Sequence, residues 1–321
     1  MSLWKLRFSV VGTLAMIIGL STLFFTIILT QIGFDFLSIG LFVVFFNIIQ
    51  WLLAPYIIDF MYRVKEVSKT DNPGLHAAVE RLSQKSGIKK PRVMVANIPI
   101  PNAFAYGSPI AGTRVAVTSE LLKTLDDEQV EAVLGHELGH LKHRDVQVMM
   151  FVSILPALFY YIGFSMMMSS MYGSRSNRDS GSAAVVIGIA SMAIYWVLTM
   201  FTLYLSRLRE YFADRHSASV VDEGPRKLSE ALAKIQASAS RMKRTPKQAG
   251  GVSSYKALFI ADPDRAASDT LAIAQAQGVA SDRRLVEEVL RRQVTTADKL
   301  LELFSTHPNM VKRLKALQEQ T

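Results

Sequence analysis

Four long charge-free runs dominate the pattern of hydrophobic and polar positions along the chain. They cover residues 8–30, 36–58, 146–174 and 180–206. Each run exceeds the roughly 20 residues that a helix needs to cross about 30 Å of hydrocarbon. A single run of this kind can be the buried helix of a soluble core, but four of them predict membrane spans. The first run is too long for the core of a signal peptide and no Ala-x-Ala site follows it, so we expect it to stay in the protein.

Short loops join these runs into two hairpins whose outer ends carry the basic residues. Residues 31–35 contain no Lys or Arg, whereas Lys5 and Arg7 precede the first hairpin and Arg63 and Lys65 follow it. The second hairpin has the same bias, less strongly. Because positively charged loops stay on the cytoplasmic side, we expect both long polar segments to face the cytoplasm, where they can build one domain.

The resulting fold class is mainly helical, with two transmembrane hairpins and a cytoplasmic α+β domain. The predicted divisions are residues 1–62 for the first hairpin, 146–206 for the second, and 63–145 with 207–321 for the polar domain. The composition agrees, because 50% hydrophobic and 20% charged residues with a mean hydropathy of +0.23 suit a membrane protein that carries a polar part. The same composition excludes a mostly disordered chain.

Shorter patterns predict the elements of the polar domain. Arg92–Ala96 is rich in valine and predicts a buried strand, and two alternating stretches around a glycine-containing turn complete a small sheet. Helical periodicity predicts the helices. The alternating stretches are 102–107 and 113–118. The predicted helices cover 71–87, Thr124 to about Asp145, and 283–304. The predicted loops are 241–254 and 262–278.

Charge and cysteine content narrow the possible partners. The net charge is +9, but in a membrane protein the excess of basic residues belongs to the flanks of the spans, so no nucleic-acid partner is expected. The chain has no cysteine, which excludes disulfides and thiolate metal sites. It also lacks a glycine-rich phosphate loop of the Walker type, so no nucleotide partner is expected.

The motif with the clearest chemistry is His-Glu-Leu-Gly-His at residues 136–140. On a helix, His136 and His140 lie one turn apart on the same face, so both imidazoles can bind one tetrahedral zinc ion. Glu137 is turned about 100° from them, where it can take a proton from the attacking water and pass it to the leaving amine. The motif is specific, because the chain has only 6 histidines. We therefore predict one Zn²⁺ per chain.

A catalytic zinc ion needs a third protein ligand and an open fourth position. His143 is unsuited, because it lies about 10.5 Å from His136 along the helix axis. A more widely spaced histidine motif would need its ligand at Val146. Glu210 remains as the candidate, since it follows the fourth span on the same side of the membrane as the histidine pair. Asp214 lies on the same helix face and can fix the tautomer of a ligand imidazole.

These motifs, placed between membrane hairpins, resemble the HtpX-type integral membrane zinc peptidases, which are gluzincins related to the prenyl-protein peptidases. The resemblance covers nearly the whole chain. Residues 102–107 resemble the family's edge strand, and residues 257–263 and 305–308 with Arg313 resemble its C-terminal signatures. The resemblance implies a zincin-like domain and an ATP-independent endopeptidase of membrane protein quality control, with His136, His140 and Glu210 on zinc and Glu137 as the base. The chain departs from the family in the longer segment at 264–304.

Further candidate residues have two interpretations each. Asn102, Ala103, Phe104 and Ala105 are predicted to bind substrate, because an edge strand pairs with an extended peptide through its backbone; the alternative is an ordinary hairpin strand. His307 can donate a hydrogen bond to the developing oxyanion or cap a helix. Arg209 and Arg313 can act in the same way or pair with acids. His76 and His216 are expected at the surface.

The predicted protein is a membrane-integrated zinc endopeptidase that hydrolyses peptide bonds. Its site is expected just above the lipid on the cytoplasmic side of the plasma membrane, in a multi-pass chain. Its expected partners are the bilayer and protein substrates that are unfolded or membrane-embedded, with misfolded or damaged membrane proteins as the main class.

Three alternatives fit the sequence less well. Intramembrane proteolysis of the site-2 type needs the motif inside a span, but the motif helix carries several acids and cannot cross lipid: Asp126, Asp127, Glu128 and Glu131. Processing of prenylated peptides needs more spans than the four found. A non-enzymatic scaffold or transporter with a structural metal needs four protein ligands, and only three are credible.

Overall fold

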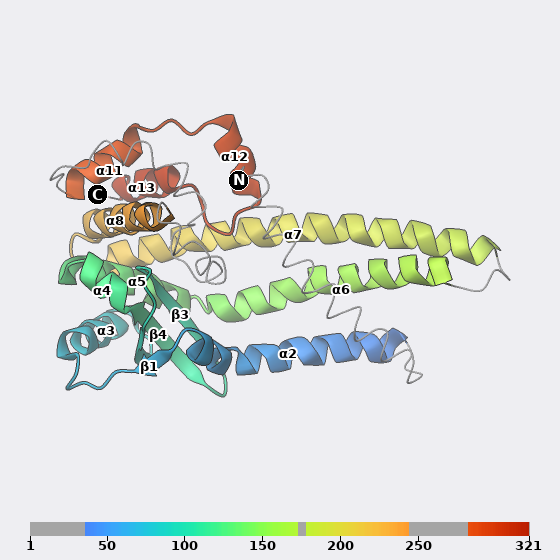
Figure 1. The fold of residues 1–321 in the computed structure, drawn as a ribbon, viewed down its shortest axis with the longest axis horizontal. Coiled ribbons are helices and arrows are strands. Elements are labelled where there is room, and N and C mark those ends of the chain that lie inside the picture. Colours follow the sequence, from blue (N-terminus) through green and yellow to red (C-terminus); the bar gives the residue numbers. More distant parts are fainter. Residues whose placement is uncertain (1–35, 173–177, 244–281, 321) are drawn as a thin grey trace. The chain divides into compact units, whose positions relative to one another are not determined.

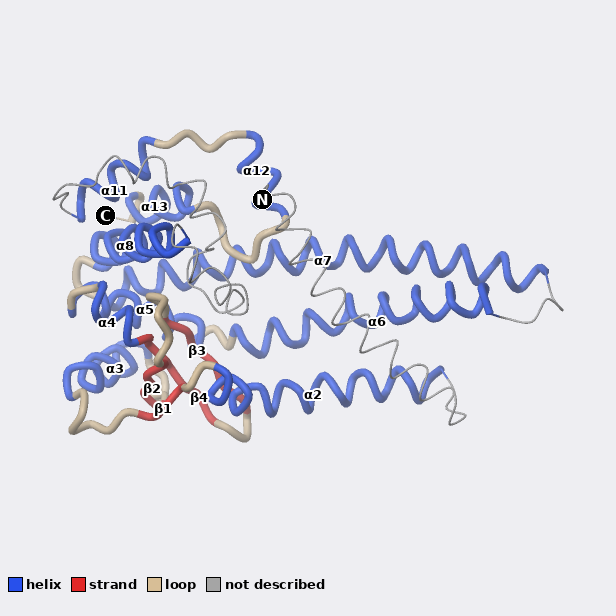
Figure 2. The backbone as a smooth tube through the Cα atoms, viewed as in Figure 1, coloured by secondary structure: helices blue, strands red, loops and turns tan. Residues whose placement is uncertain are grey.

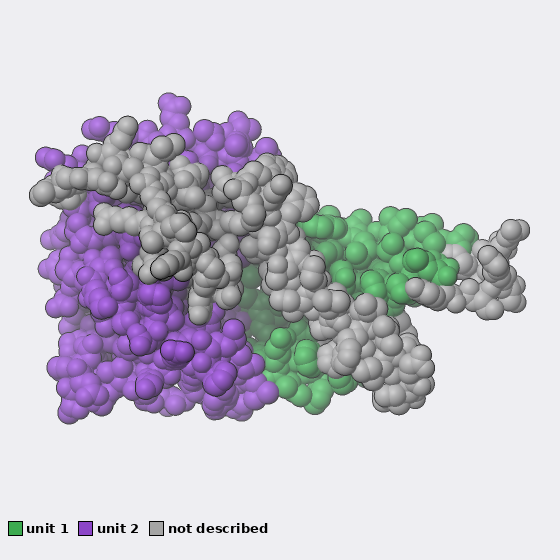
Figure 3. All heavy atoms as spheres, viewed as in Figure 1, with its two compact units in different colours: residues 1–51, 147–205 green, residues 52–146, 206–321 purple. Residues whose placement is uncertain are grey.

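The computed structural model describes residues 36–172, 178–243 and 282–320. Within these ranges the protein is mainly helical, with one small mixed sheet (Figures 1 and 2). The chain divides into two compact units, which Figure 3 shows in different colours. One unit comprises residues 1–51 and 147–205, and the other comprises residues 52–146 and 206–321.

Three described helices are long and apolar enough to cross a membrane, namely α2 (Phe36–Met61), α6 (Asp145–Tyr172) and α7 (Arg178–Val220). They contain the predicted runs 36–58, 146–174 up to Tyr172, and 180–206, so the helical interpretation of these three runs is confirmed. The run 8–30 lies outside the described residues. The helix α7 continues well past Ser206, where its sequence becomes charged, and this last part belongs to the second unit.

In the first unit, α6 and α7 approach closely through two glycines. A Cβ atom on Gly163 of α6 would lie 3.0 Å from the carbonyl oxygen of Gly188 on α7 and 2.9 Å from Met192 Cγ. A Cβ atom on Gly188 would in turn lie 2.8 Å from Met167 Cγ of α6. Small residues at such a contact let two apolar helices pack backbone to backbone, which is how helices associate when lipid removes the hydrophobic driving force.

The second unit contains the sheet, whose strand order is β1-β2-β4-β3. The strands are β1 (Val64–Glu66), β2 (Arg92–Ala96), β3 (Ala103–Ser108) and β4 (Gly112–Thr118). The strands β2 and β4 are parallel, while the other two pairs are antiparallel, so β3 forms one edge. The three predicted strands are confirmed. The strand β1 was not predicted, because three residues are too few to show alternation.

The side chains of the sheet alternate between two cores, as the pleat requires. Val115 and Val117 of β4 join a large core with α3 (Pro73–Ser86), α5 (Asp127–Lys142) and α8 (Gly224–Lys243). Ala116 faces the opposite side, where Phe104 and Tyr106 of β3 pack with Tyr62, which follows α2. The sheet is therefore held between the helix that carries the histidine motif and the end of a membrane helix.

Capping residues explain where the predicted helices differ from the observed ones. The helix α3 begins after Asn72 and ends at Gly87, whose φ of 68° suits glycine, close to the prediction. The helix predicted from Thr124 is wrong at its start, because α4 (Ser119–Thr124) ends there and α5 begins after its cap Asp126. The single helix predicted over 283–304 is two helices, α11 (Asp282–Arg291) and α12 (Thr296–Leu303), because Thr295 caps α12. The last helix is α13 (Met310–Gln318).

The Gly163 contact gives a test of the packing between α6 and α7. Replacing Gly163 by leucine forces side-chain atoms into the Gly188 backbone, so we expect a loss of about 1–3 kcal/mol of stability, as for other overpacked sites. Thermal unfolding in detergent should then occur at a lower temperature than in the unmodified protein. The control is Gly40→Leu on α2, where a Cβ atom meets nothing within 4 Å. An equal unfolding temperature for both variants would contradict the close contact.

Candidate active site

The histidine motif occupies the buried last turns of α5. The helix starts with a capping box, in which Asp126 and Gln129 each accept a hydrogen bond from the other's backbone N–H. The spacing of four residues then brings His136 and His140 together, with their Nε2 atoms 3.2 Å apart. His136 and Glu137 are almost fully buried. The helix thus presents two imidazole nitrogens to one point in space.

The end of α7 brings the two carboxylates to this point, because glycines on α5 let it come close. A Cβ atom on Gly139 would lie 3.1 Å from the Cα of Ala213, and one on Gly135 would lie 3.0 Å from Ser217 Oγ. Ser217 Oγ also donates a 2.6 Å hydrogen bond to the carbonyl of Ala132 on α5. Gly135 and Gly139 therefore form the side of α5 on which α7 packs closely. Glu210 is carried by the same part of α7.

His136, His140 and Glu210 form a group that can hold a metal ion, because one donor atom from each lies within 4.8 Å of the others. Glu210 Oε1 lies 3.5 Å from His140 Nε2, and Oε2 lies 3.7 Å from His136 Nε2. Oε2 is buried and accepts no hydrogen bond. A buried carboxylate oxygen without a hydrogen bond can accept a metal ion, and its one ion-pair partner among the described side chains other than the histidines is Arg313, whose Nη1 lies 3.3 Å away.

The Nδ1 atom of each of these two histidines lies next to a carboxylate. His136 Nδ1 lies 2.9 Å from Asp214 Oδ1, and His140 Nδ1 lies 2.6 Å from Asp145 Oδ2. A carboxylate accepts the proton of Nδ1–H, which leaves the lone pair on Nε2 free. Both free lone pairs therefore point toward the carboxylate of Glu210. The three atoms are thereby placed to act together as ligands of one cation.

Asp145 was not recognised as a site residue from the sequence, because a turn rather than a helix spacing places it. The helix α5 ends at Lys142, Arg144 has a positive φ of 55°, and Asp145 then opens α6. This left-handed turn brings the buried Asp145 back to His140. Arg209 Nε lies 3.0 Å from Asp145 Oδ1, so Arg209 pairs with an acid. In the sequence, the only indication of this role was an acidic residue placed directly after the motif helix.

Arg313 of α13 holds Asp214 from the other side. Its Nε donates a 2.8 Å hydrogen bond to Asp214 Oδ2 and its Nη2 donates a 2.6 Å bond to Oδ1. Its Nη1 lies 3.3 Å from Glu210 Oε2. Burial alone would lower the pKa of Arg313, but the two carboxylates raise it above its ordinary value. Of the two interpretations of Arg313, the structure therefore supports pairing with acids.

Glu137 lies next to the proposed metal position and next to the edge strand. Burial raises the pKa of Glu137 above its ordinary value, although His136 and His140 act in the opposite direction. Burial alone would lower the pKa of His140, but its hydrogen bond to Asp145 and the charge of Glu210 raise it. The backbone N–H of Ala105 donates a hydrogen bond to the Glu137 carboxylate. This bond joins the motif helix to β3.

The residues predicted to bind substrate lie on or next to β3, the strand at the edge of the sheet, where Asn102, Ala103 and Phe104 are almost fully buried. The N–H of Thr118 donates to the carbonyl of Asn102, and the pairing of β3 with β4 continues from there. In an antiparallel pair, alternate residues exchange hydrogen bonds, so the N–H and C=O groups of Ala103 and Ala105 point away from β4. The side chain of Phe104 is buried in the core of the opposite sheet face. The edge beside Glu137 thus offers backbone groups.

His307 lies beside Glu210, with Nε2 3.8 Å from Oε1. It belongs to the turn between α12 and α13, where Ser305 Oγ bonds the backbone of His307. Arg207 of α7 fixes this turn, because its Nη1 donates 2.8 Å bonds to the carbonyls of Glu302 and Ser305. The structure therefore brings His307 to the same group as the predicted metal ligands.

Three other histidines have no place in the group. The surface prediction for His216 is wrong, because it is buried and its Nε2 lies 2.9 Å from Ser86 Oγ. His76 is half-buried, with Nε2 2.8 Å from the carbonyl of Val67. His143 caps α5 and is exposed, which agrees with the prediction that it is not a metal ligand. The C-terminal signature at 257–263 lies outside the described residues.

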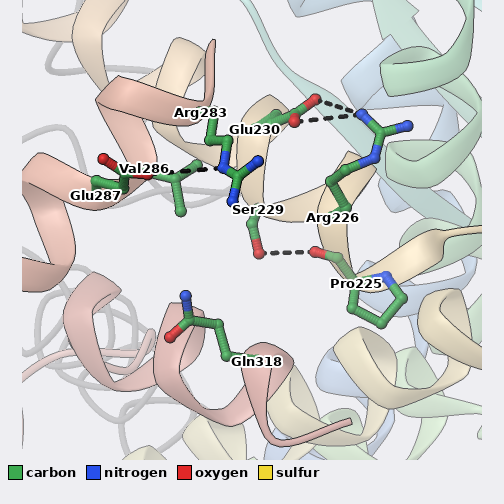
Figure 4. A pocket seen from close by; sticks show the side chains of 8 residues that line it. All are labelled: Pro225, Arg226, Ser229, Glu230, Arg283, Val286, Glu287 and Gln318. Atoms are coloured by element: carbon green, nitrogen blue, oxygen red, sulfur yellow. Dashed lines mark hydrogen bonds and ion pairs between the residues drawn. The ribbon is translucent and has the colours of Figure 1, made fainter. Parts of the chain in front are cut away.

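A separate pocket lies between α8, α11 and α13 (Figure 4). Its charged side chains pair with one another: Arg226 lies 3.1 Å from Glu230, and Arg283 lies 3.6 Å from Glu287. Figure 4 shows both pairs at the rim, with Ser229 bonded to a backbone carbonyl. These groups are already satisfied, so the pocket does not compete with the histidine centre as a reaction site.

Comparisons with known proteins identify the family of the chain. Residues 69–321 match the family described as Peptidase family M48. The chain is 40% identical over 272 residues to "Protease HtpX homolog" of Aeropyrum pernix, covering 84% of this chain and 82% of that protein. It is 35% identical over 278 residues to "Protease HtpX homolog" of Thermoplasma acidophilum, covering 85% of this chain and 82% of that protein.

A solved structure has a similar fold. The crystal structure of S. mikatae Ste24p aligns with a TM-score of 0.56 over 98% of this chain. The sequence identity is 18%, so the likeness concerns the fold alone, and this chain spans 66% of the length of that one.

The fold and the family match together define a metalloprotease with membrane helices. The chain belongs to peptidase family M48, as an HtpX-type member. The predicted resemblance and the prediction of an enzyme are thereby confirmed, and the non-enzymatic alternative is excluded.

The pairing of Asp145 with His140 predicts a measurable effect on metal binding. Asp145→Asn removes the charge that orients the imidazole and stabilises its Nδ1–H, so the affinity for zinc should fall about 10- to 100-fold. Competition with a chelator of known affinity measures this change. The control is Asp222→Asn, whose side chain is 94% exposed and lies 3.4 Å from Lys85. An unchanged affinity in the Asp145 variant would show that this carboxylate does not support a metal ligand.

Proposed function

We propose that this protein is an ATP-independent zinc endopeptidase that cleaves unfolded or damaged membrane proteins. The observation that carries the proposal is the convergence of three metal-binding atoms from His136, His140 and Glu210. Two imidazoles and one carboxylate are the ligand set of catalytic zinc sites that keep a fourth position open. The chain contains no cysteine that could close the site as a structural one.

The residues of the chain fit a zinc ion at this point. Nitrogen and carboxylate donors suit Zn²⁺, and the Asp145 and Asp214 carboxylates leave both imidazoles with a free Nε2. When bound, zinc lowers the pKa of a water molecule to near 7 and polarises a carbonyl group. A zinc ion held by His136, His140 and Glu210 would therefore provide this chemistry beside Glu137.

Glu137 is the proposed general base and acid. Its carboxylate lies on the motif helix directly after His136, so it can take a proton from the attacking water and hand it to the leaving nitrogen. The N–H of Ala105 holds this carboxylate in position. His307, fixed beside Glu210 by the turn that Arg207 binds, is the proposed donor to the charge that develops on the carbonyl oxygen.

The edge strand β3 is the proposed binding site for the substrate backbone. Asn102, Ala103, Phe104 and Ala105 precede or form its first half. The N–H and C=O of Ala103 and the C=O of Ala105 do not bond β4 and can pair with an extended peptide. Main-chain pairing requires little of the substrate sequence. It requires an extended segment, which is available in unfolded proteins and in exposed tails. The binding site therefore supports unfolded protein as the substrate class.

The membrane arrangement is proposed from the sequence and the helix lengths. We infer two hairpins, with bounds at 1–62 and 146–206, and a peptidase domain formed from 63–145 and 207–321. The basic residues at the outer ends of the hairpins support a site on the cytoplasmic side of the plasma membrane. The helix α6 starts at Asp145, which contacts His140, so the site lies close to where a membrane helix begins.

A second candidate function is the processing of prenylated peptides. This alternative rests on the fold shared with Ste24p, but a similarity at 18% sequence identity does not show which substrate this chain cleaves. Cleavage of a non-prenylated unfolded protein favours the proposed function over this alternative.

The role of Glu137 is tested by its amide variant. Zinc-loaded Glu137→Gln keeps the side-chain shape but accepts no proton, so degradation of casein should slow by about 10²- to 10⁴-fold. The matched control is Glu131→Gln on the same helix, whose carboxylate lies 2.9 Å from Arg81. The control and the unmodified protein should both lose activity when a chelator removes the metal. Equal cleavage by the Glu137 variant and the unmodified protein would mean that Glu137 is not the base.

The substrate class is tested in reconstituted vesicles. A membrane protein with an unfolded tail on the side of the peptidase domain should be cut, and the cut should fall within the tail near the bilayer. Mass spectrometry of the fragments locates the cleavage. If soluble unfolded protein is cut while no membrane substrate is, the proposed preference for membrane proteins is wrong.

A further inference from the structure

The strand β3 runs along the last ten residues of α2, and three contacts define the register. The rings of Phe104 and Tyr62 lie 6.0 Å apart. Two residues further along β3, Tyr106 Oη donates a 2.6 Å hydrogen bond to Asp59. Ser108 Oγ then donates a 2.9 Å bond to the carbonyl of Leu52. As β3 proceeds, its partners therefore move back along α2, from its end toward its apolar middle.

An ion pair stabilises this arrangement. Arg114 of β4, almost fully buried, pairs with the same Asp59 that receives Tyr106. Its guanidinium also lies 5.2 Å from the ring of Tyr56, one turn back along α2. The hairpin formed by β3 and β4 is thus attached to α2 at several points, and its direction relative to the helix axis is fixed.

The turn between β3 and β4 therefore lies level with the apolar part of α2. Leu52 precedes Asp59, the first charged residue after the run, by seven residues, or about 10 Å of helix. The part of α2 that is long and apolar enough to cross a membrane runs over Gly40–Met61, so Leu52 lies nine residues, or about 14 Å of helix, before its end. With α2 in a bilayer, the level of Leu52 therefore lies on the hydrocarbon side of the headgroup boundary.

The composition and the hydrogen bonding of the turn between β3 and β4 suit a place at the membrane boundary. Residues 107–113 contain no charged side chain, and Ile110 at the tip is 58% exposed. Ser108 Oγ accepts the N–H of Ala111, and Arg92 donates to the carbonyl of Ala111. Pro109 has no N–H. Several backbone polar groups of the turn are thus satisfied inside the protein, which lowers the cost of leaving water.

Exposed apolar side chains on α2 continue the surface around the turn. Phe60 is 87% exposed and Tyr56 is 48% exposed. Aromatic side chains at the end of a membrane helix are typical of the headgroup region. Tyr56 and Phe60 belong to a helix that is itself long and apolar enough to cross a membrane, and Ser108 bonds the turn that carries Ile110 to the same helix. The attachment of the turn to this helix makes lipid the occupant that we infer.

We propose that the turn between β3 and β4 inserts into the membrane interface and anchors the edge strand at the bilayer surface. Its ligand is the lipid surface itself, contacted through Ile110 at the headgroup boundary. If β3 binds substrate as proposed above, the binding edge begins where the membrane ends. An extended polypeptide that leaves the bilayer then meets the free groups of β3 at once.

The absence of cysteine allows a direct test, because a single introduced cysteine carries the only label. Ile110→Cys is labelled with an environment-sensitive fluorophore in the full chain, reconstituted in vesicles of phosphatidylcholine and phosphatidylglycerol. The control is Lys123→Cys on α4, which follows the opposite end of β4 and has a 72% exposed side chain. Half of the vesicles contain lipid brominated on the acyl chain close to the headgroup.

If the turn is anchored in lipid, the fluorophore at position 110 should emit at a shorter wavelength than in water. Brominated lipid should quench this emission. The label at position 123 should keep the emission of a water-exposed probe and remain unquenched. Equal, unquenched emission at both positions would overturn the proposal. A blue shift at 110 without quenching would also overturn it, because a protein surface rather than lipid would then cover the turn.

A second pair of variants tests the consequence for catalysis. Ile110→Asp should slow the cleavage of a vesicle-embedded substrate, whereas Ile110→Leu should not. Both should cleave casein like the unmodified protein, which shows that they are folded. An unchanged rate on the embedded substrate with Ile110→Asp would contradict the positioning role of the anchor. Failure of every variant and of the unmodified protein to cleave would count against the proposed function, whereas the lipid quenching tests the anchor independently.

Discussion

The site depends on one electrostatic constraint, which is that three acceptor atoms converge in a buried place. The Nδ1 atoms of His136 and His140 face carboxylates, so their Nε2 atoms present lone pairs to each other and to Glu210. A cation between the acceptors stabilises such an arrangement, and Arg313 Nη1, 3.3 Å from Glu210 Oε2, balances part of the carboxylate charge. The carboxylates are held in turn by arginines, Asp214 by Arg313 and Asp145 by Arg209. Outward from the proposed metal position, each histidine is therefore followed by a carboxylate and each carboxylate by an arginine. Each of these contacts fixes the orientation of the neighbouring side chain.

This chain of contacts joins segments that are far apart in the sequence. The histidines come from α5, Glu210 and Asp214 from the end of α7, and Arg313 from α13. Close packing at Gly135 and Gly139 brings α7 to the motif helix. The sheet adds its edge strand through the bond from Ala105 to Glu137. Since the same strand follows the last residues of α2, from Leu52 on, the motif helix, the edge strand and the end of α2 belong to one compact unit.

Local patterns in the sequence predicted the parts of this structure that depend on local spacing. The apolar runs, the strands and the pair His136 and His140 follow from periodicity, because each involves neighbours within one element. Glu210 and Asp214 were found as candidates because four residues separate them on one helix. Asp145 was missed, since a left-handed turn at Arg144 places it beside His140. The partner of Arg313 could not be chosen from the sequence either, because 99 residues separate it from Asp214 and only tertiary packing brings them together. The same holds for the buried His216, whose hydrogen-bond partner lies on a distant helix.

The central claim is that His136, His140 and Glu210 hold one zinc ion. X-ray diffraction from crystals of the full chain, recorded on both sides of the zinc absorption edge, tests it most directly. The account predicts a single anomalous peak in each chain, within bonding distance of the Nε2 atoms of His136 and His140 and of a Glu210 oxygen. A zinc-loaded crystal without a peak at this point, or with its peak at other side chains, would contradict it.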